Sequence, residues 1–208
     1  RIFSNPDYVF QHMEKSNLTK YAEDFRFIFN AAWAKFPGVK EMSSESAQKL
    51  VKTMKPIIDE QLLWFAYTTD GTPIAFFIVI PDLNQIVKHL NGKLNWWGMI
   101  KFLLLKMKGT MTRTCGVIFG VTPEHQGKGL ATTLIQKALD YSFNILNLHK
   151  IYLLVAVENK KAIHLYQKSG FIEEGHLVQE FFINGCYQDV KRMYLLQDDY
   201  LKRNFALA

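Results

Sequence analysis

Cysteines are scarce in this sequence, and no apolar run is long enough to cross a membrane. The two cysteines, Cys115 and Cys186, lack the spacing of a metal site. We interpret them as reduced thiols of a cytoplasmic protein, with a single disulfide as the alternative. The most apolar stretch, MIKFLLLKM, is short and contains two lysines. It therefore predicts no integral membrane contact.

Acidic residues are also fewer than basic ones, which leaves a formal net charge of +6. This excess favours anionic partners, although lysines that merely solvate the surface would produce it too. No interleaving of basic and aromatic residues predicts nucleic-acid binding. The histidines at 149, 164 and 176 are scattered, so no metal site is expected. The length of 208 residues and the 49% hydrophobic content predict one globular domain over residues 1–208.

The first part of the chain is patterned as helices followed by a hairpin. Residues 7–35 have helix-like spacing, and Ser43 or Ser44 can cap a second helix that runs towards Met54. Strand-like residues then flank Asp70-Gly71, a favoured hairpin turn.

Residues 84–113 are an inserted helical segment with a predicted helix at about 96–107. Lys101 and Lys108 project to one side of this helix, whereas Lys106 points about 140° away. Two interpretations stay open, a membrane-surface helix and a helix packed on the domain with snorkelling lysines.

The second part of the chain predicts strand, helix, strand, helix and a final hairpin. A buried-type strand at 115–121 precedes a helix whose apolar face runs from Leu130 to Ile145. A second buried strand at 151–157 precedes a short helix from Asn159 to Ser169. The final hairpin turns at Asn184-Gly185. The whole order predicts an α/β (α+β) fold with a mixed sheet in one domain.

The stretch VTPEHQGKGLATTLI joins the first buried strand to its helix through two glycines. Strand, glycine-rich turn and helix is an arrangement that exposes unpaired backbone N–H groups to an anion. Glycine permits close approach because it has no Cβ, and Lys128 adds a positive charge. The spacing matches neither a P-loop nor the dinucleotide fingerprint.

Two motifs in this half resemble those of the GNAT superfamily, the acyl-CoA-dependent N-acyltransferases. QGKGLA resembles the Q/R-x-x-G-x-G/A pyrophosphate loop, and NKKAIHLYQKSGF resembles N-x-x-A-x-x-x-Y-x-x-x-G-F. The resemblance implies a mostly antiparallel sheet in which two parallel central strands splay apart around acetyl-CoA.

The same resemblance implies a role for particular residues. The backbone of Phe119 to Val121 would pair with the pantetheine arm, and Asn159 would bond the arm from the other strand. Tyr166 would be the general acid beside the sulfur, and the Val121 N–H would stabilise an oxyanion. The residues implied to hold pyrophosphate are Gln126, Gly127, Lys128, Gly129, Leu130 and Ala131.

No general base is evident in the sequence. An amine with a lysine-like pKa near 10.4 is neutral in roughly one molecule of a few thousand at pH 7, so a base or a desolvating site should matter. The strand TCGVIFGV has no carboxylate, and Gly116 stands near the position that relatives give to one. The remaining candidates are Asp82, Glu124, His125 and Glu158.

The two halves of the chain resemble different branches of the family. Residues 122–203 resemble the bacterial spermidine N-acetyltransferases, and residues 1–125 resemble the C-terminal domain of larger GNAT-like proteins, with a seam near 121–131. Recombination or an engineered chimera would produce this pattern. We expect transfer of an acetyl group from acetyl-CoA to a small-molecule amine, a polyamine being one candidate. An inactive CoA-binding scaffold is the alternative, and a homo-oligomer stays open.

Overall fold

The computed structural model describes residues 6–34, 39–90, 96–108, 112–183 and 185–205. Its centre is one sheet in the order β1-β2-β3-β4-β5-β7-β6. All neighbouring strands are antiparallel except the parallel pair of β4 and β5. This confirms the predicted mixed sheet. The strands are β1 (Tyr8–His12), β2 (Leu63–Thr68), β3 (Pro73–Pro81), β4 (Arg113–Val121), β5 (Lys150–Ala156), β6 (Ile172–Ile183) and β7 (Cys186–Leu196).

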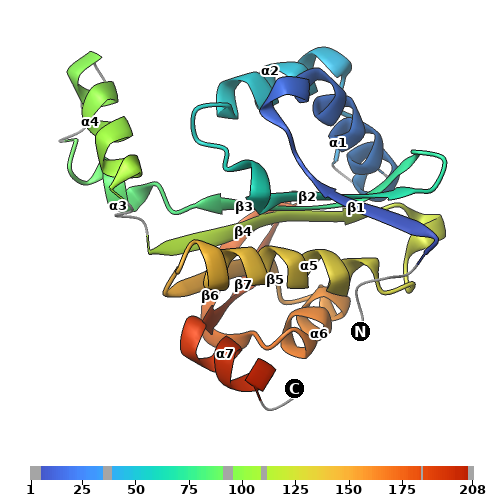
Figure 1. Cartoon of the computed structure of the whole chain (residues 1–208). Coiled ribbons are helices and arrows are strands. Elements are labelled where there is room, and N and C mark those ends of the chain that lie inside the picture. The colour runs from blue at the N-terminus through green and yellow to red at the C-terminus, as the bar shows by residue number, and fades with distance from the viewer. Residues whose placement is uncertain (1–5, 35–38, 91–95, 109–111, 184, 206–208) are drawn as a thin grey trace.

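Helices cover both faces of this sheet (Figure 1). α1 and α2 lie on one face, while α5, α6 and α7 lie on the other. α3 and α4 follow β3 and project beyond the end of the sheet. The helices are α1 (Leu18–Trp33), α2 (Ser44–Met54), α3 (Asn84–Val87), α4 (Trp96–Met107), α5 (Leu130–Asp140), α6 (Lys160–Lys168) and α7 (Gln197–Phe205).

Several elements agree with the sequence because local signals specify their ends. The Ser43 hydroxyl accepts a hydrogen bond from the Ser46 N–H at 3.2 Å and so caps α2. Gly71 and Gly185 adopt positive φ in the two hairpin turns. Gly170 does the same just after α6.

The N-terminal expectation was wrong in part. Residues 8–12, predicted as helix, form β1, which pairs antiparallel with β2. Pairing with a distant strand here outweighs the local helical spacing. The helix predicted from Leu130 to Ile145 is shorter than expected. α5 ends at Asp140, and a π-helical turn follows from Tyr141 to Ile145. The wider turn breaks the 3.6-residue alignment, so Ile145 is 70% exposed rather than on the buried face.

Most of the core lies between the sheet and its helices. Phe76 of β3 and Phe25 of α1 pack with ring centroids 4.8 Å apart on the α1 face. Leu134 and Ile135 of α5 are fully buried on the other face. A second, small core of Ile86, Leu90 and Phe102 holds α3 and α4 together.

Gly120 of β4 lies against this core with little room to spare. A Cβ added there would stand 3.0 Å from the Phe76 ring and 3.4 Å from Ile28. We expect Gly120→Ala to lower the free energy of unfolding by about 1–3 kcal/mol, because the side chains must shift in a close-packed core. Denaturant titration measures this loss.

Gly116 on the same strand is the matched control. A Cβ there would be 3.5 Å from Leu153 Cβ, an ordinary contact. Gly116→Ala should therefore leave stability unchanged or raise it slightly. Equal losses in the two variants would contradict the packing argument.

Candidate functional site

The parallel strands β4 and β5 separate part of the way along their length. Their ladder pairs Arg113–Gly116 with Lys150–Leu153 and goes no further, although β4 continues to Val121 and β5 to Ala156. The register of β4 with β3 also shifts between Ile78 and Val79, which gives β4 one extra residue at this point. Such a bulge bends the strand. The two strands therefore splay after Gly116, as the resemblance to the GNAT superfamily implied.

The edge of β4 beyond Gly116 presents backbone groups to this opening. The Thr122 N–H donates to the Ile74 carbonyl at 2.9 Å, which marks a hydrogen-bonded pair with β3. In an antiparallel ladder such pairs recur at every second residue, so Gly120 and Ile118 also bond β3. The N–H and C=O groups of Phe119 and Val121 consequently point towards the β5 side.

Two side chains contact the carbonyls of this edge. The indole N–H of Trp33, at the end of α1, donates to the Phe119 carbonyl at 3.2 Å. The side-chain amide of Gln126 lies 3.4 Å from the Val121 carbonyl. Sequence reasoning missed Trp33, and no local signal could have found it, because it meets β4 only in the folded chain.

The glycine-rich turn leads directly from β4 into α5. Gly127 and Gly129 have φ of 76° and 80°, and Gly129 is the N-cap residue of α5. No side chain of a described residue caps this helix, and its first turn has no acidic residue. Within the described chain, the N–H groups of residues 127–132 donate no hydrogen bond to other protein atoms. The turn therefore presents a row of unbonded donors at a positive helix end.

This turn fits a pyrophosphate group. A Cβ placed on Gly127 or Gly129 would meet no heavy atom within 4 Å, so the space above the backbone is open. Lys128 is exposed between the two glycines, while Leu130 is buried and anchors the helix start. Gln126 precedes the row of donors, and Ala131 supplies one of them. These are the donors that an anion of this size requires.

Asn159 lies across the opening, directly after β5. Its side-chain oxygen accepts from the Ala162 N–H at 3.1 Å, so it caps α6. The residue is exposed, which leaves its amide N–H₂ accessible.

Tyr166 lies on α6, with its ring in edge contact with Phe171 at 5.8 Å between centroids. Burial of the hydroxyl raises the pKa of Tyr166 to about 12. Among the described residues, its hydroxyl has no hydrogen-bond partner. At neutral pH the group therefore keeps its proton and has it available to donate.

The four residues considered as general bases are either exposed or bonded to groups close to them in the sequence or on β4. Glu124 is exposed in the 3-10 helix Pro123–His125, and Glu158 is exposed in a turn. His125 Nδ1 lies 3.1 Å from the Thr122 hydroxyl. Asp82 accepts from the Asn84 N–H at 3.2 Å, and its own N–H bonds Arg113, at the end of β4 far from Val121. Asp82 thus caps a turn and does not face the opening.

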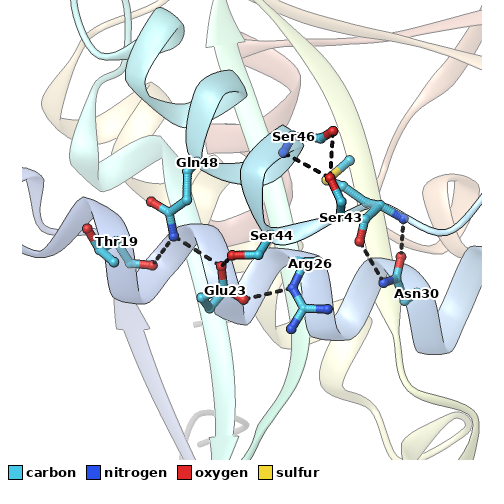
Figure 2. Close-up of polar contacts among 9 residues, drawn as sticks. Thr19, Glu23, Arg26, Asn30, Ser43, Ser44, Ser46 and Gln48 are labelled. Carbon is cyan, nitrogen blue, oxygen red and sulfur yellow. Dashed lines mark hydrogen bonds and ion pairs between the residues drawn. The ribbon is translucent and has the colours of Figure 1, made fainter.

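A polar network fixes α2 against α1, the helix that ends at Trp33 (Figure 2). The Glu23 carboxylate accepts hydrogen bonds from Ser44, Gln48 and Arg26, whose contact distance is 2.7 Å. These bonds, led by that of Ser44, lower the pKa of Glu23 to about 2. Further along α1, Asn30 bonds both backbone groups of Met42. The pair of helices therefore holds the Trp33 indole against β4.

The cysteines and an open hollow between α1 and α2 contribute no further residue to this site. Both cysteines are free thiols, as expected. In the part of the chain that the structure describes, no cluster of His, Cys, Asp or Glu could hold a metal, and no helix is long and apolar enough to cross a membrane. An open hollow of about 750 Å³ lies between α1 and α2, but it is lined from Leu18 and Thr19, at the opposite end of α1 from Trp33.

Comparison with known proteins assigns this geometry to a family. The model of the acetyltransferase (GNAT) family matches residues 25–171. Spermidine N(1)-acetyltransferase from Vibrio cholerae is 75% identical over 84 residues, which are 40% of this chain and 49% of that protein. The Escherichia coli K12 protein of the same name is 56% identical over 81 residues, 39% of this chain and 44% of that protein.

Solved structures extend the similarity over nearly the whole chain. Spermidine N-acetyltransferase from Vibrio cholerae in complex with CoA and spermine is 37% identical, with a TM-score of 0.63, over 95% of this chain and 99% of that one. By sequence, however, the chain matches only about half the length of these curated relatives. Much of the identity is therefore concentrated in one stretch.

Proposed function

Because this chain belongs to the acetyltransferase (GNAT) family, we propose that it transfers the acetyl group of acetyl-CoA to a primary amine. The observation that carries this proposal is the junction of β4 and α5. There the edge of Phe119 and Val121, which β5 leaves unpaired, continues into a turn whose N–H groups, from residue 127 to 132, have no partner among the described residues. An extended arm with amide groups would pair with the edge, and its phosphates would meet the turn.

Acetyl-CoA supplies the acetyl group as a thioester. In the proposed reaction the Val121 N–H donates to the carbonyl oxygen on which negative charge develops. The amine nitrogen forms the new C–N bond while the C–S bond breaks. Tyr166 gives its proton to the departing sulfur, and the amine gives up a proton to restore Tyr166. Asn159 would hold the arm from the β5 side.

The relative solved with CoA and spermine makes a polyamine the first acceptor class to test. The curated matches span only about half of those enzymes, so their acceptor does not transfer with the family. We infer that the two halves of the chain come from different branches, with the seam near 121–131. The free thiols fit a reducing compartment such as the cytoplasm.

A CoA-binding scaffold without activity is the second candidate. It is favoured by the lack of a carboxylate on β4. It is also favoured because Asp82 caps a turn and because Glu124 and Glu158 are exposed to solvent. Release of free thiol from acetyl-CoA, measured with a panel of amines that includes spermidine, separates the two. Release with any amine supports the transferase. Binding of CoA without release from any amine would contradict it.

Excess acetyl-CoA should raise the melting temperature of the protein. A ligand that binds only the native state stabilises it by about 2.7 kcal/mol at a hundred times Kd. For a chain of this length, that corresponds to a rise of roughly 5–10 °C. A thermal-shift assay measures it, with adenosine as the control that lacks pyrophosphate and the pantetheine arm. An unchanged melting temperature at millimolar acetyl-CoA would refute the binding site.

A further inference from the structure

The positive charge of this protein is concentrated in one segment, residues 83–113. This segment contains six of the 25 lysines and arginines and none of the 19 acidic residues. The rest of the chain therefore has equal numbers of basic and acidic residues. Lysines that only solvate a surface are normally interspersed with acidic groups. The segment thus differs from an ordinary solvated surface.

The two helices of this segment, α3 and α4, stand apart from the body of the fold. α3 and α4 project beyond the end of the sheet (Figure 1). They are held by the small core of Ile86, Leu90 and Phe102, which is separate from the main core. One side of α4 is consequently packed, and its other side faces outward.

The outward side of α4 combines apolar and basic side chains. At 100° per residue, one sector of α4 about 60° wide contains Trp97, Lys101, Leu104 and Lys108. Phe102 points about 140° away from Trp97. Trp97 is 73% exposed and Leu104 is 54% exposed. Trp96 adds a second exposed indole, 72% accessible, beside Trp97. Lys101 and Lys108 are exposed as well, and the Lys101 ammonium donates to the His89 carbonyl at 2.7 Å.

We propose that α4 docks on an anionic phospholipid surface and lies in the plane of the interface. Indole and leucine side chains favour the boundary between headgroups and acyl chains, and lysines beside them keep their ammonium groups among the phosphates. A cluster of four to eight basic residues is a typical lipid-binding density. The attachment is peripheral, since α4 has only 12 residues.

The charge of α4 favours an anionic lipid surface over a second copy of the chain as its partner. A two-fold contact through α4 would place one acid-free segment against another, so Lys101 and Lys108 would meet like charges. An anionic lipid surface has the opposite sign. It also accepts the apolar side chains that a purely electrostatic partner would leave in water.

Co-sedimentation with vesicles tests the proposal. We expect the whole chain to bind phosphatidylcholine vesicles that contain roughly one third phosphatidylglycerol, and to bind pure phosphatidylcholine far more weakly. Lys101→Gln with Lys108→Gln should lower the partition coefficient about 30-fold, since each lysine near such a surface contributes roughly fivefold. Trp97→Ala should lower it about tenfold by removing an inserted ring.

Matched variants elsewhere serve as controls. Lys49→Gln with Lys52→Gln removes the same charge from the exposed face of α2, and Phe182→Ala removes an exposed ring from β6. Both should bind vesicles like the wild type. The proposal fails if the wild type does not bind anionic vesicles, or if the α2 variant loses as much binding as the α4 variant. It also fails if Trp97→Ala dissociates a dimer and leaves vesicle binding unchanged.

Discussion

Gly129→Glu is expected to abolish CoA binding. Gly129 opens α5 at φ 80°, and the space above it is open. A glutamate would fill this space and place a negative charge where the proposed site holds phosphate. It would also remove the advantage of a positive helix end for an anion. Calorimetric titration with CoA measures the loss.

Two variants separate this effect from strain. Any side chain at a left-handed position costs about 1–2 kcal/mol, so Gly129→Glu will be less stable than the wild type. Gly71→Glu introduces the same strain at φ 88° in the β2–β3 turn, also into open space, and should retain CoA binding. Gly129→Gln has the size of glutamate without its charge and should bind CoA more tightly than Gly129→Glu. Wild-type affinity in a folded Gly129→Glu protein would refute the phosphate site.

Tyr166→Phe should lower kcat for acetyl transfer about 100-fold. The substitution keeps the ring and its contact with Phe171, so α6 should pack as before. It removes only the proton donor. General-acid catalysis contributes roughly 10²–10⁴-fold, and a thiol is a good leaving group, which favours the lower end. The KM for acetyl-CoA should change little, because the lost interaction matters mainly in the transition state.

The raised pKa of Tyr166 adds a pH dependence to this prediction. Because its folded pKa of about 12 exceeds the ordinary value near 10, the hydroxyl stays protonated through neutral and moderately alkaline pH. Activity should therefore rise with pH as the amine acceptor loses its proton, without a fall from loss of the tyrosine proton below about pH 10. The stabilising effect of burying the neutral hydroxyl is complete below pH 10 and is lost as pH rises towards 12.

Tyr21→Phe is the control for this substitution. Tyr21 is also a buried tyrosine, but it lies 12 residues before Trp33 on α1, about 18 Å along the helix from the residue that contacts Phe119. Its variant should keep wild-type kcat. If Tyr166→Phe also keeps wild-type kcat in an active enzyme, Tyr166 has no part in the chemistry.

The sequence alone determined the family and the local elements of the candidate site. The motif QGKGLA predicted an anion-binding turn, because two glycines between a strand and a helix leave backbone donors unpaired. The two hairpins followed for a similarly local reason from Asp70-Gly71 and Asn184-Gly185. Turns and caps are specified by residues a few positions apart, so a linear pattern contains them.

Only the tertiary structure decided where distant segments meet. β1 exists because residues 8–12 find β2, although their spacing alone favours a helix. Trp33 contacts Phe119, from a helix whose position depends on the network around Glu23. The tertiary structure likewise determines which side of α4 is packed, because Phe102 is buried and Trp97 is exposed. Such contacts depend on which surfaces are buried together when the chain folds, and periodicity within one segment contains no information about its partner.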